Sequence, residues 1–351
     1  MKILLDEFDS KRVETLNVTI ENNAAVLEIL ADFLNTKEKS ITTEMLNEIA
    51  LEYDMPFATA FSMLLASSCG LEIYENQLHK ELFNDYFLPS VKEFQAKDFS
   101  DDLYLKTIKF PLKTFKNWEL KFSEYAPCEA FICDEIVVTS DFREYPQIGF
   151  FREKFSYPAV FQDGREWMAV KPNEIFTMQQ PVENSFGKVL TFGLGLGYFA
   201  FLSSTKKSVK SVTIVEKNAD IIELFSTEIL PQFPEKEKIR IINDDAFSFA
   251  ENIKEGDFDY IFSDIWHDSF DGLPLYLKLR KILEKLPKTR CDYWIEKSLL
   301  SSLRYNVFSQ LYKIFKNPSK TASENEKVIK NYQEFVKMIS DKELKNIKIH
   351  N

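Results

Sequence analysis

The sequence is poor in glycine, histidine and cysteine. Its 351 residues include only nine glycines, three histidines and four cysteines. The cysteines are scattered, and one close pair, Cys128 and Cys133, has no matching second pair; the others are Cys69 and Cys291. This spacing argues against a disulfide framework and against a structural zinc site, so we expect no metal. It is typical of a protein in a reducing compartment, and we expect the protein to be cytoplasmic.

Long apolar runs and an excess of basic residues are also lacking. No run reaches the roughly 18 apolar residues of a membrane span, and the start, "MKILLDEFDSKR", does not resemble a signal peptide. The net charge of −11 argues against nucleic acid or an anionic membrane as the main partner. With 45% apolar and 28% charged residues, the composition is that of a globular protein. We expect a small-molecule substrate, no nucleic acid and no membrane, and leave a homodimer open.

The first part of the chain, residues 1–110, is predicted to be a helical N-terminal domain. "NNAAVLEILADFL" has apolar residues at helical spacing, and "ITTEMLNEIALEY" begins with Thr42 or Thr43 as the candidate N-cap. Pro56 can open the next helix and Gly70 can end it. The helical pattern continues through "YENQLHKELFNDYFL" and "PSVKEFQAKDF". We expect this domain to pack against or gate the rest, without chemistry of its own.

Two further regions follow. Residues 111–180 are rich in β-branched and aromatic residues with turn signals such as "QDGR", and predict a small β-region. Residues 181–351 predict an α/β domain with a helical C-terminal tail, in which "NIKIH" is considered as a short strand. Its strands, "KVLTFG", "SVTIVE", "KIRII", "FDYIFSDI" and "CDYWIE", alternate with helical segments. The predicted fold class is therefore α/β, with a doubly wound, mostly parallel, Rossmann-like sheet.

The richest glycine segment lies at the first of these strands, in "KVLTFGLGLGYFAFL". A P-loop is excluded because Tyr198 follows the last glycine where Gly-Lys-Ser/Thr would be needed. A dinucleotide site stays open, because Gly195, Gly197 and Ala200 satisfy G-x-G-x-x-G/A and Glu216 lies about 20 residues further on. A third hypothesis is an S-adenosylmethionine-type ligand. A G-x-G-x-G turn, here Gly193, Gly195 and Gly197, would let the backbone approach such a nucleoside because no Cβ intrudes.

Carboxylates after the next strands favour the third hypothesis over NAD. Glu216 ends the second strand and can accept bonds from both ribose hydroxyls; Asp245 follows the third and can accept from an adenine amino group. Asp264 ends the fourth strand, next to the expected reaction centre. In a parallel sheet these strand ends share one edge, where ligands bind. An NAD site needs only the first acid.

With these segments, residues 157–297 resemble the class I S-adenosylmethionine-dependent methyltransferase fold, and more closely its spermidine-synthase-like branch. "FQDGREWMAVKPNEI" is similar to the D-G-x-x-Q…D-E hairpin, "VLTFGLGLG" to V-L-x-x-G-G-G-D-G, and "VTIVEKN" to V-E-x-D. "NDDAF" is similar to D-G/A-F, and "SDIWHD" stands where the family has D-S-S-D-P. The resemblance implies S-adenosyl-L-methionine, or its decarboxylated form, as cofactor. It implies cofactor contacts from the three loop glycines, Glu216, Asp245 and Ala246, and a reacting group next to Asp264.

Several positions depart from the family pattern. Thr191 and Leu196 stand where acids normally hold the methionine-derived amine, and Trp167 replaces the glutamine of the hairpin. The polyamine-binding Y-x-E appears as Thr177-Met178-Gln179, and the acid spacing becomes Asp264-x3-Asp268. These changes disfavour ordinary spermidine synthesis. No clear pair of strands follows the fifth strand, so we also expect an altered sheet edge.

The predicted site combines these acids with neighbouring side chains. Asp264 and His267 are the candidate catalytic residues, and His267 is a candidate general base; Trp266, Tyr157 and Gln180 are the candidate substrate-binding residues. Structural alternatives stay open: Asp245 as a helix cap, Glu216 as a solvated strand end, and Asp268 and Asp271 as cap residues. The predicted function is an S-adenosylmethionine-dependent methyltransferase acting on a small-molecule acceptor. The alternatives are an aminopropyltransferase using decarboxylated S-adenosylmethionine, or a non-catalytic binding protein on the same fold.

Overall fold

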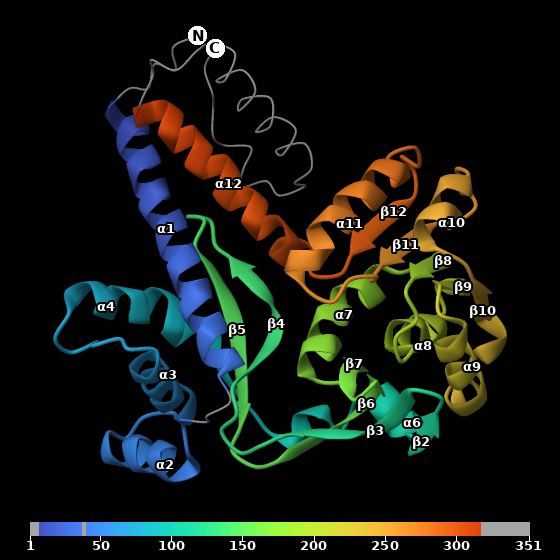
Figure 1. The fold of residues 1–351 in the computed structure, drawn as a ribbon, viewed down its shortest axis with the longest axis horizontal. Coiled ribbons are helices and arrows are strands. Elements are labelled where there is room, and N and C mark those ends of the chain that lie inside the picture. Colours follow the sequence, from blue (N-terminus) through green and yellow to red (C-terminus); the bar gives the residue numbers. More distant parts are fainter. Residues whose placement is uncertain (1–6, 37–39, 317–351) are drawn as a thin grey trace.

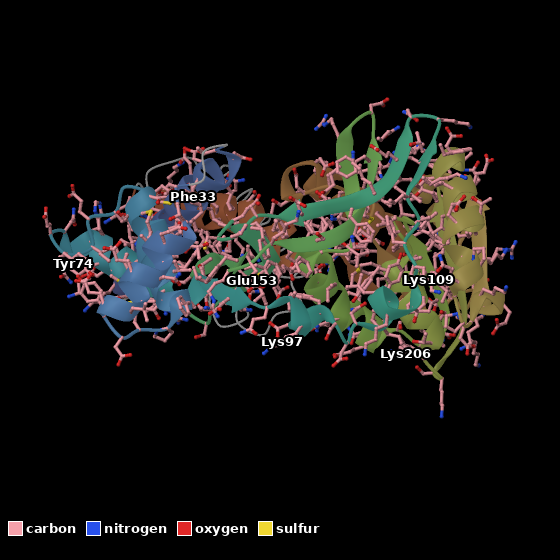
Figure 2. All side chains as sticks on the ribbon, turned by 90° about the horizontal axis from the view of Figure 1, so that it is seen from below. Phe33, Tyr74, Lys97, Lys109, Glu153 and Lys206 are labelled. Carbon is pink, nitrogen blue, oxygen red and sulfur yellow. The ribbon has the colours of Figure 1, made fainter. Side chains whose placement is uncertain are left out.

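The computed structural model describes residues 7–36 and 40–316 (Figure 1). Viewed from below, the N-terminal helices with Tyr74 lie at one end and the α/β region with Lys109 and Lys206 at the other (Figure 2). Within this part of the chain, no helix combines the length and apolarity needed to cross a membrane. The strand considered for "NIKIH" and the rest of the expected C-terminal tail beyond Lys316 lie outside the described residues.

The N-terminal part is mainly helical, as predicted. Thr42 caps the second helix by accepting a hydrogen bond from the Met45 N–H at 3.3 Å, and Gly70 takes a left-handed φ of +80° just after the third. The helices are α1 (Glu7–Asn35), α2 (Thr43–Glu52), α3 (Phe57–Ser68), α4 (Gln77–Leu82), a π-helical turn (Phe83–Phe87), α5 (Leu88–Ser90), a 3₁₀ turn (Ala96–Phe99) and α6 (Leu103–Thr107).

The expected helix over "PSVKEFQAKDF" is wrong in its centre, where Val91–Phe94 forms strand β1. β1 pairs in parallel with β5 (Glu144–Phe151), which also pairs with β4 (Phe131–Val138). The buried side chain of Val91 packs in the core that the helices share with β5. This long-range pairing overrides the local helical pattern. The first sheet therefore combines strands from both sides of residue 110.

A second sheet connects this region to the α/β domain. It is antiparallel, in the order β2 (Lys113–Phe115), β3 (Trp118–Tyr125), β6 (Phe155–Gln162) and β7 (Arg165–Ala169). Helix α7 (Pro172–Asn184) follows β7 directly and begins with a proline, whose missing N–H costs nothing in a first helical turn.

The third sheet has five parallel strands, in the order β10 (Ile239–Asn243), β9 (Val209–Glu216), β8 (Gly187–Phe192), β11 (Tyr260–Ser263) and β12 (Arg290–Tyr293). The chain starts in the middle, runs to one edge and then crosses to the other side. This is the order of a Rossmann-like sheet, and its strand order reverses between β8 and β11. In the described part of the chain no strand follows β12; helix α12 (Glu296–Lys316) follows instead.

Helices cover both faces of this sheet. Val189 and Leu190 are neighbours on β8, yet they belong to two separate apolar cores because successive side chains point to opposite faces. One core includes α8 (Tyr198–Thr205) and α9 (Ala219–Glu228), and the other includes α10 (Ala246–Asn252) and α11 (Ser269–Leu283). Two short 3₁₀ turns (Leu230–Gln232 and Lys236–Lys238) lead from α9 to β10. The sheet is doubly wound, as predicted.

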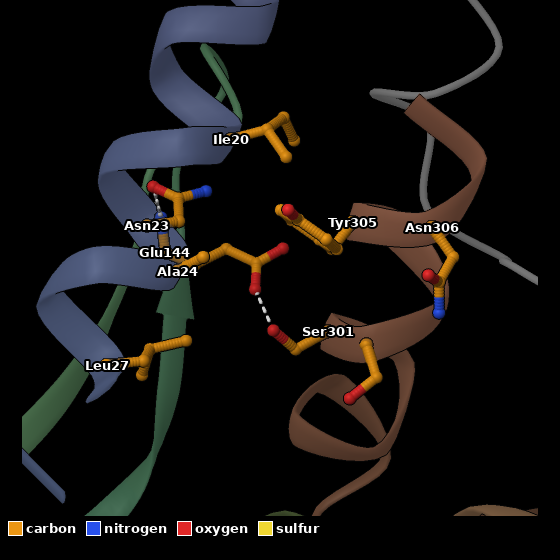
Figure 3. Close-up of a pocket in the computed structure, with 9 residues that line it drawn as sticks. Ile20, Asn23, Ala24, Leu27, Glu144, Ser301, Tyr305 and Asn306 are labelled. Atoms are coloured by element: carbon orange, nitrogen blue, oxygen red, sulfur yellow. Dashed lines mark hydrogen bonds between the residues drawn. The ribbon is translucent and has the colours of Figure 1, made fainter. Parts of the chain in front are cut away.

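A buried polar network ties α1 and α12 to β5 beside a small cavity of about 320 Å³ (Figure 3). The Glu144 carboxylate on β5 forms an ion pair with Arg304 and accepts a hydrogen bond from Ser301, both on α12. On α1, Asn23 accepts from the Glu144 N–H at 3.0 Å and from the Tyr86 hydroxyl at 2.9 Å. The Glu144 and Arg304 side chains are only 2% and 5% exposed, so each needs the other's charge.

Candidate functional site

A cavity of about 940 Å³ opens at the carboxyl ends of β8, β9, β10 and β11. This is the edge where a Rossmann-like sheet binds its ligands, and the volume lies at the upper end of the range for ligand pockets. The cavity continues beyond the sheet to α7, β4 and α1.

Most of the predicted site residues line this cavity. They are Gly193, Gly195, Glu216, Asp245, Ala246, Asp264, Trp266 and His267. Gly197, Tyr157 and Gln180 do not line it. The strand ends named from the sequence therefore meet at one cavity, whereas three of the residues predicted to contact a ligand do not line it.

Gly197, Tyr157 and Gln180 lie outside the cavity for different structural reasons. Gly197 is the N-cap of α8 and packs against the ring of Phe225. Tyr157 is buried on β6, and its hydroxyl donates to Glu166 at 3.3 Å; Glu166 rather than Tyr157 reaches the cavity. Gln180 is exposed on α7, outside the cavity.

The glycines of the loop are required by the packing of the protein itself. Gly193 has a φ of +96°, and a Cβ there would lie 2.0 Å from the carbonyl oxygen of Asp264. At Gly195, with a φ of +51°, a Cβ would lie 2.0 Å from the sulfur of Met168. No L-residue with a side chain fits these positions without displacing its neighbours. The sequence suggested that the glycines let the loop approach a nucleoside. In the structure they let it approach Asp264, just after β11, and Met168 on β7.

Leu196 stands where the resemblance noted in the sequence would place an acid in this loop. Its side chain is 2% exposed in the core, and its carbonyl oxygen accepts a hydrogen bond from the Tyr104 hydroxyl of α6 at 2.7 Å. Thr191, at the other position where an acid is expected, is also buried. Neither residue can hold an ammonium group by charge, so a ligand amine at this loop would need a different partner.

Glu216 connects the second strand to the glycine loop. Its carboxylate accepts the Asn218 N–H at 2.8 Å and the Leu194 N–H at 3.2 Å, one on each oxygen. A carboxylate has about four lone-pair sites, so it can still accept from hydroxyl groups in the cavity. Glu216 is therefore more than a solvated strand end: it fixes the loop that it would share with a ligand.

Asp245 is a helix cap, the structural alternative considered from the sequence. Its Oδ1 accepts the N–H groups of Phe247 and Ser248, both at 3.0 Å, at the start of α10. For its Oδ2 the structure shows no bond among the described residues. The residue lines the cavity while it caps the helix, so the cap leaves one oxygen for a ligand.

Asp264 shares the cavity with a second carboxylate, Glu174 in the first turn of α7. Burial raises the pKa of Asp264 to about 7. Burial, and then the nearby charge of Asp264, raise the pKa of Glu174 well above its ordinary value, while Lys171 acts in the opposite direction. Two carboxyl groups that resist ionisation together form a pair that can hold a proton or accept a cation.

His267 is more exposed than Asp264, the other predicted catalytic residue, and 57% of its side chain is accessible. Its Nδ1 lies 3.1 Å from Oδ2 of Asp271, and its ring meets the edge of Trp167 with centroids 4.8 Å apart. Asp268 and Asp271 exchange side-chain to backbone hydrogen bonds at 3.1 Å at the start of α11. They are cap residues, as the structural alternative predicts, and Asp271 also orients His267.

Trp266 is a buried wall residue of the cavity. It is 4% exposed, and its indole N–H donates to the carbonyl oxygen of Trp294 at 3.2 Å. This bond links the loop after β11, which also contains Asp264, to the loop after β12. Both loops line the cavity.

The cavity is strongly acidic. Two lysines, Lys171 and Lys217, line it together with nine carboxylates: Asp134, Glu135, Glu166, Glu174, Glu216, Asp244, Asp245, Asp264 and Asp268. Lys171 is already paired with Glu166 at 2.6 Å. This balance suits a ligand with net positive charge. Within the described residues, no three His, Cys, Asp or Glu side chains are grouped so that they could hold a metal ion.

Sequence reasoning missed Glu174 and the far wall of the cavity. Glu174 stands in "PNEIF", where an acid in a first helical turn is normally solvated, and its burial depends on α7 packing near the end of β11. The far wall comes from α1 and β4. The α1 segment "NNAAVLEILADFL" was expected to have no role in a site. No local signal identifies these residues.

Comparisons with known proteins identify no family. No protein-family profile matches the chain, and no curated protein matches it in sequence. The solved structures with partial similarity include the following two. One is a spermidine synthase from Thermotoga maritima, with 12% identity, a TM-score of 0.32 and 45% of this chain aligned to 58% of that chain. The other is a precorrin 8W decarboxylase from Methanobacterium thermoautotrophicum, with 17% identity, a TM-score of 0.26 and 34% aligned to 61%. The chain spans less than two thirds of either neighbour, and at these scores neither says what this protein does.

Proposed function

We propose that this protein is an S-adenosylmethionine-dependent methyltransferase that acts on a small amine. The observation that carries the proposal is the set of acids at one sheet edge. Glu216, Asp245 and Asp264 stand at the carboxyl ends of three different strands and line one acidic cavity. A sulfonium ligand is cationic, and so is an amine acceptor, so both fit this charge balance.

The residues have separate roles in this proposal. Glu216 accepts ribose hydroxyls while it fixes the loop at Leu194, and Asp245 accepts from the base through Oδ2. Bound S-adenosylmethionine supplies an activated methyl group, so the protein mainly has to position an acceptor in line with it. Asp264, with Glu174 beside it, orients the acceptor amine and takes the proton that this amine loses. His267 lies at the accessible side, where Asp271 holds its ring.

Aminopropyl transfer from decarboxylated S-adenosylmethionine is a second candidate, and the charge balance specifically favours it. The methionine tail carries a carboxylate that decarboxylation removes. In a cavity with nine acids, where Lys171 is already paired with Glu166, that carboxylate has few cationic partners. The decarboxylated donor avoids this repulsion.

The experiment compares donors and the Asp264→Asn variant. Purified protein is incubated with labelled S-adenosylmethionine, or with its decarboxylated form labelled in the aminopropyl group, and a panel of primary amines. We expect one donor to give a labelled product, and Asp264→Asn to lower turnover by roughly 10²-fold. The variant should keep its affinity for S-adenosylhomocysteine within about 0.5 kcal/mol. Full turnover by the variant would exclude the role of Asp264, and ligand binding without any product would favour a non-catalytic binding protein.

A further inference from the structure

From the second wall of the cavity we infer that the acceptor is an amine with a cationic head and an apolar body, which lies against α1 and β4. This inference rests on the proposed function, because it takes the Asp264 end of the cavity as the place of the head group. It adds the chemical character of the rest of the acceptor, which is apolar.

The α1 part of this wall is an apolar stripe. Leu27, Leu30, Ala31 and Leu34 line the cavity at helical spacing, so they share one face of α1. Leu30 is fully buried in the N-terminal core, whereas Ala31 is exposed on the cavity side. Leu30 therefore fixes the stripe to the N-terminal core, and Ala31 leaves part of it accessible from the cavity.

The β4 part of the wall is also apolar. Ala130, Ile132 and Ile136 line the cavity, and Ile132 is 39% exposed, which is high for a large apolar side chain on a paired strand. Apolar groups from two distant segments therefore line one hollow that continues to Asp264 and Glu174. Covering such surface with an apolar ligand removes it from water and is favourable.

Each of the two acids of this wall, Asp134 and Glu135, is bonded through one of its oxygens. Glu135 accepts the N–H groups of Lys297 and Ser298, at 2.5 and 3.2 Å, at the start of α12. Asp134 accepts the Glu135 N–H at 2.7 Å through Oδ1. Both bonds to Glu135 are on Oε1, so Glu135 and Asp134 each keep one oxygen without a bond among the described residues. Apart from these two acids and Asn35, the α1 and β4 residues that line the cavity are apolar.

The test is a chain-length series on the full-length protein saturated with S-adenosylhomocysteine. Linear primary amines from butylamine to octylamine are titrated by calorimetry. We expect the affinity of the monoamines to rise by about fourfold per added methylene, which corresponds to ~0.8 kcal/mol for each buried CH₂. No dependence of affinity on chain length would overturn the inference.

Matched variants place the effect on this wall. Ala31→Asp introduces a charge on the cavity side of α1, and Ala25→Asp makes the same change at an exposed position of α1 that lines neither cavity. Ala31→Asp should weaken octylamine binding by tenfold or more, and Ala25→Asp should leave it unchanged. Ile132→Thr keeps a β-branched shape on β4 and should give a smaller loss. Equal effects of the two alanine variants would contradict the assignment.

The series separates this inference from the proposed function. If S-adenosylhomocysteine does not bind to the wild-type protein, the proposed function fails. The same amines titrated into the protein alone then still test the wall. If S-adenosylhomocysteine binds but amine affinity ignores chain length, the proposed function stands and the apolar-body inference fails.

Discussion

The two walls of the main cavity differ in how they are built. The sheet-edge wall consists of short segments that directly follow β8, β9, β10 and β11, and its acids lie there because parallel strands end together. The wall of α1 and β4 is assembled from segments about a hundred residues apart, and the network around Glu144 holds α1 against β5 and α12 (Figure 3). The first wall is charged and the second largely apolar. A local pattern can therefore reveal where a ligand is held, while its size and polarity depend on long-range packing.

The largest effect is expected from removing the charge that supports the α1 wall. Glu144→Ala leaves the guanidinium of Arg304 buried without its partner, and we expect a loss of about 3–5 kcal/mol in the free energy of unfolding. Urea unfolding followed by circular dichroism measures it. The double variant Glu144→Leu, Arg304→Met removes both charges and should recover much of the loss. If the single variant is as stable as the wild type, the network does not hold this wall.

A somewhat smaller loss is expected at the sheet-edge wall. Gly193→Ala combines a left-handed φ with a clash against the carbonyl oxygen of Asp264, and should cost about 3 kcal/mol. Gly70→Ala is the matched control, because its φ of +80° is similar but its Cβ would meet nothing within 4 Å. It should cost about 1–2 kcal/mol, from backbone conformation alone. Equal losses in the two variants would mean that contact with Asp264 is not what requires a glycine.

Glu216→Ala should weaken S-adenosylhomocysteine binding by about 1.5–3 kcal/mol, the scale of hydrogen bonds to a charged group. Part of this loss comes from the loop, because Glu216 also accepts the Leu194 N–H. Calorimetry on folded variants measures the change, with Glu223→Ala, an exposed residue of α9, as the control. Unchanged affinity in Glu216→Ala would show that the carboxylate only fixes the loop.

A further effect concerns the pH dependence of stability. The pKa of Asp264 is raised to about 7, so the folded protein holds a proton that the unfolded chain releases at lower pH. Stability should therefore fall as the pH rises from about 4 through 7. Asp264→Asn should flatten this fall, whereas Asp32→Asn, on α1, should not. Thermal unfolding of the ligand-free protein between pH 5 and 8 measures this change in stability. If stability falls with pH equally in Asp264→Asn and in the wild type, Asp264 is not the source of the pH dependence.

These differences explain how far the sequence could be interpreted. The alternation of strands and helices after residue 187 predicted the doubly wound sheet, because each element has its own periodicity. Glu216 and Asp264 could be placed in the cavity because Glu216 is the last residue of β9 and Asp264 directly follows β11. β1 could not be predicted, because its pairing with β5 joins residues far apart in the chain. Glu174 and Ala31 could not be found either, because their part in the cavity depends on how α7 and α1 pack.

The central claim is that the sheet-edge wall holds an adenosyl-sulfur ligand. Calorimetric titration of the full-length protein with S-adenosylhomocysteine and, separately, with NADH tests it most directly. Because Asp245 and Asp264 line the same cavity as Glu216, the account predicts saturable binding of S-adenosylhomocysteine, clearly tighter than that of NADH. Tighter binding of NADH, or no binding of S-adenosylhomocysteine, would contradict it.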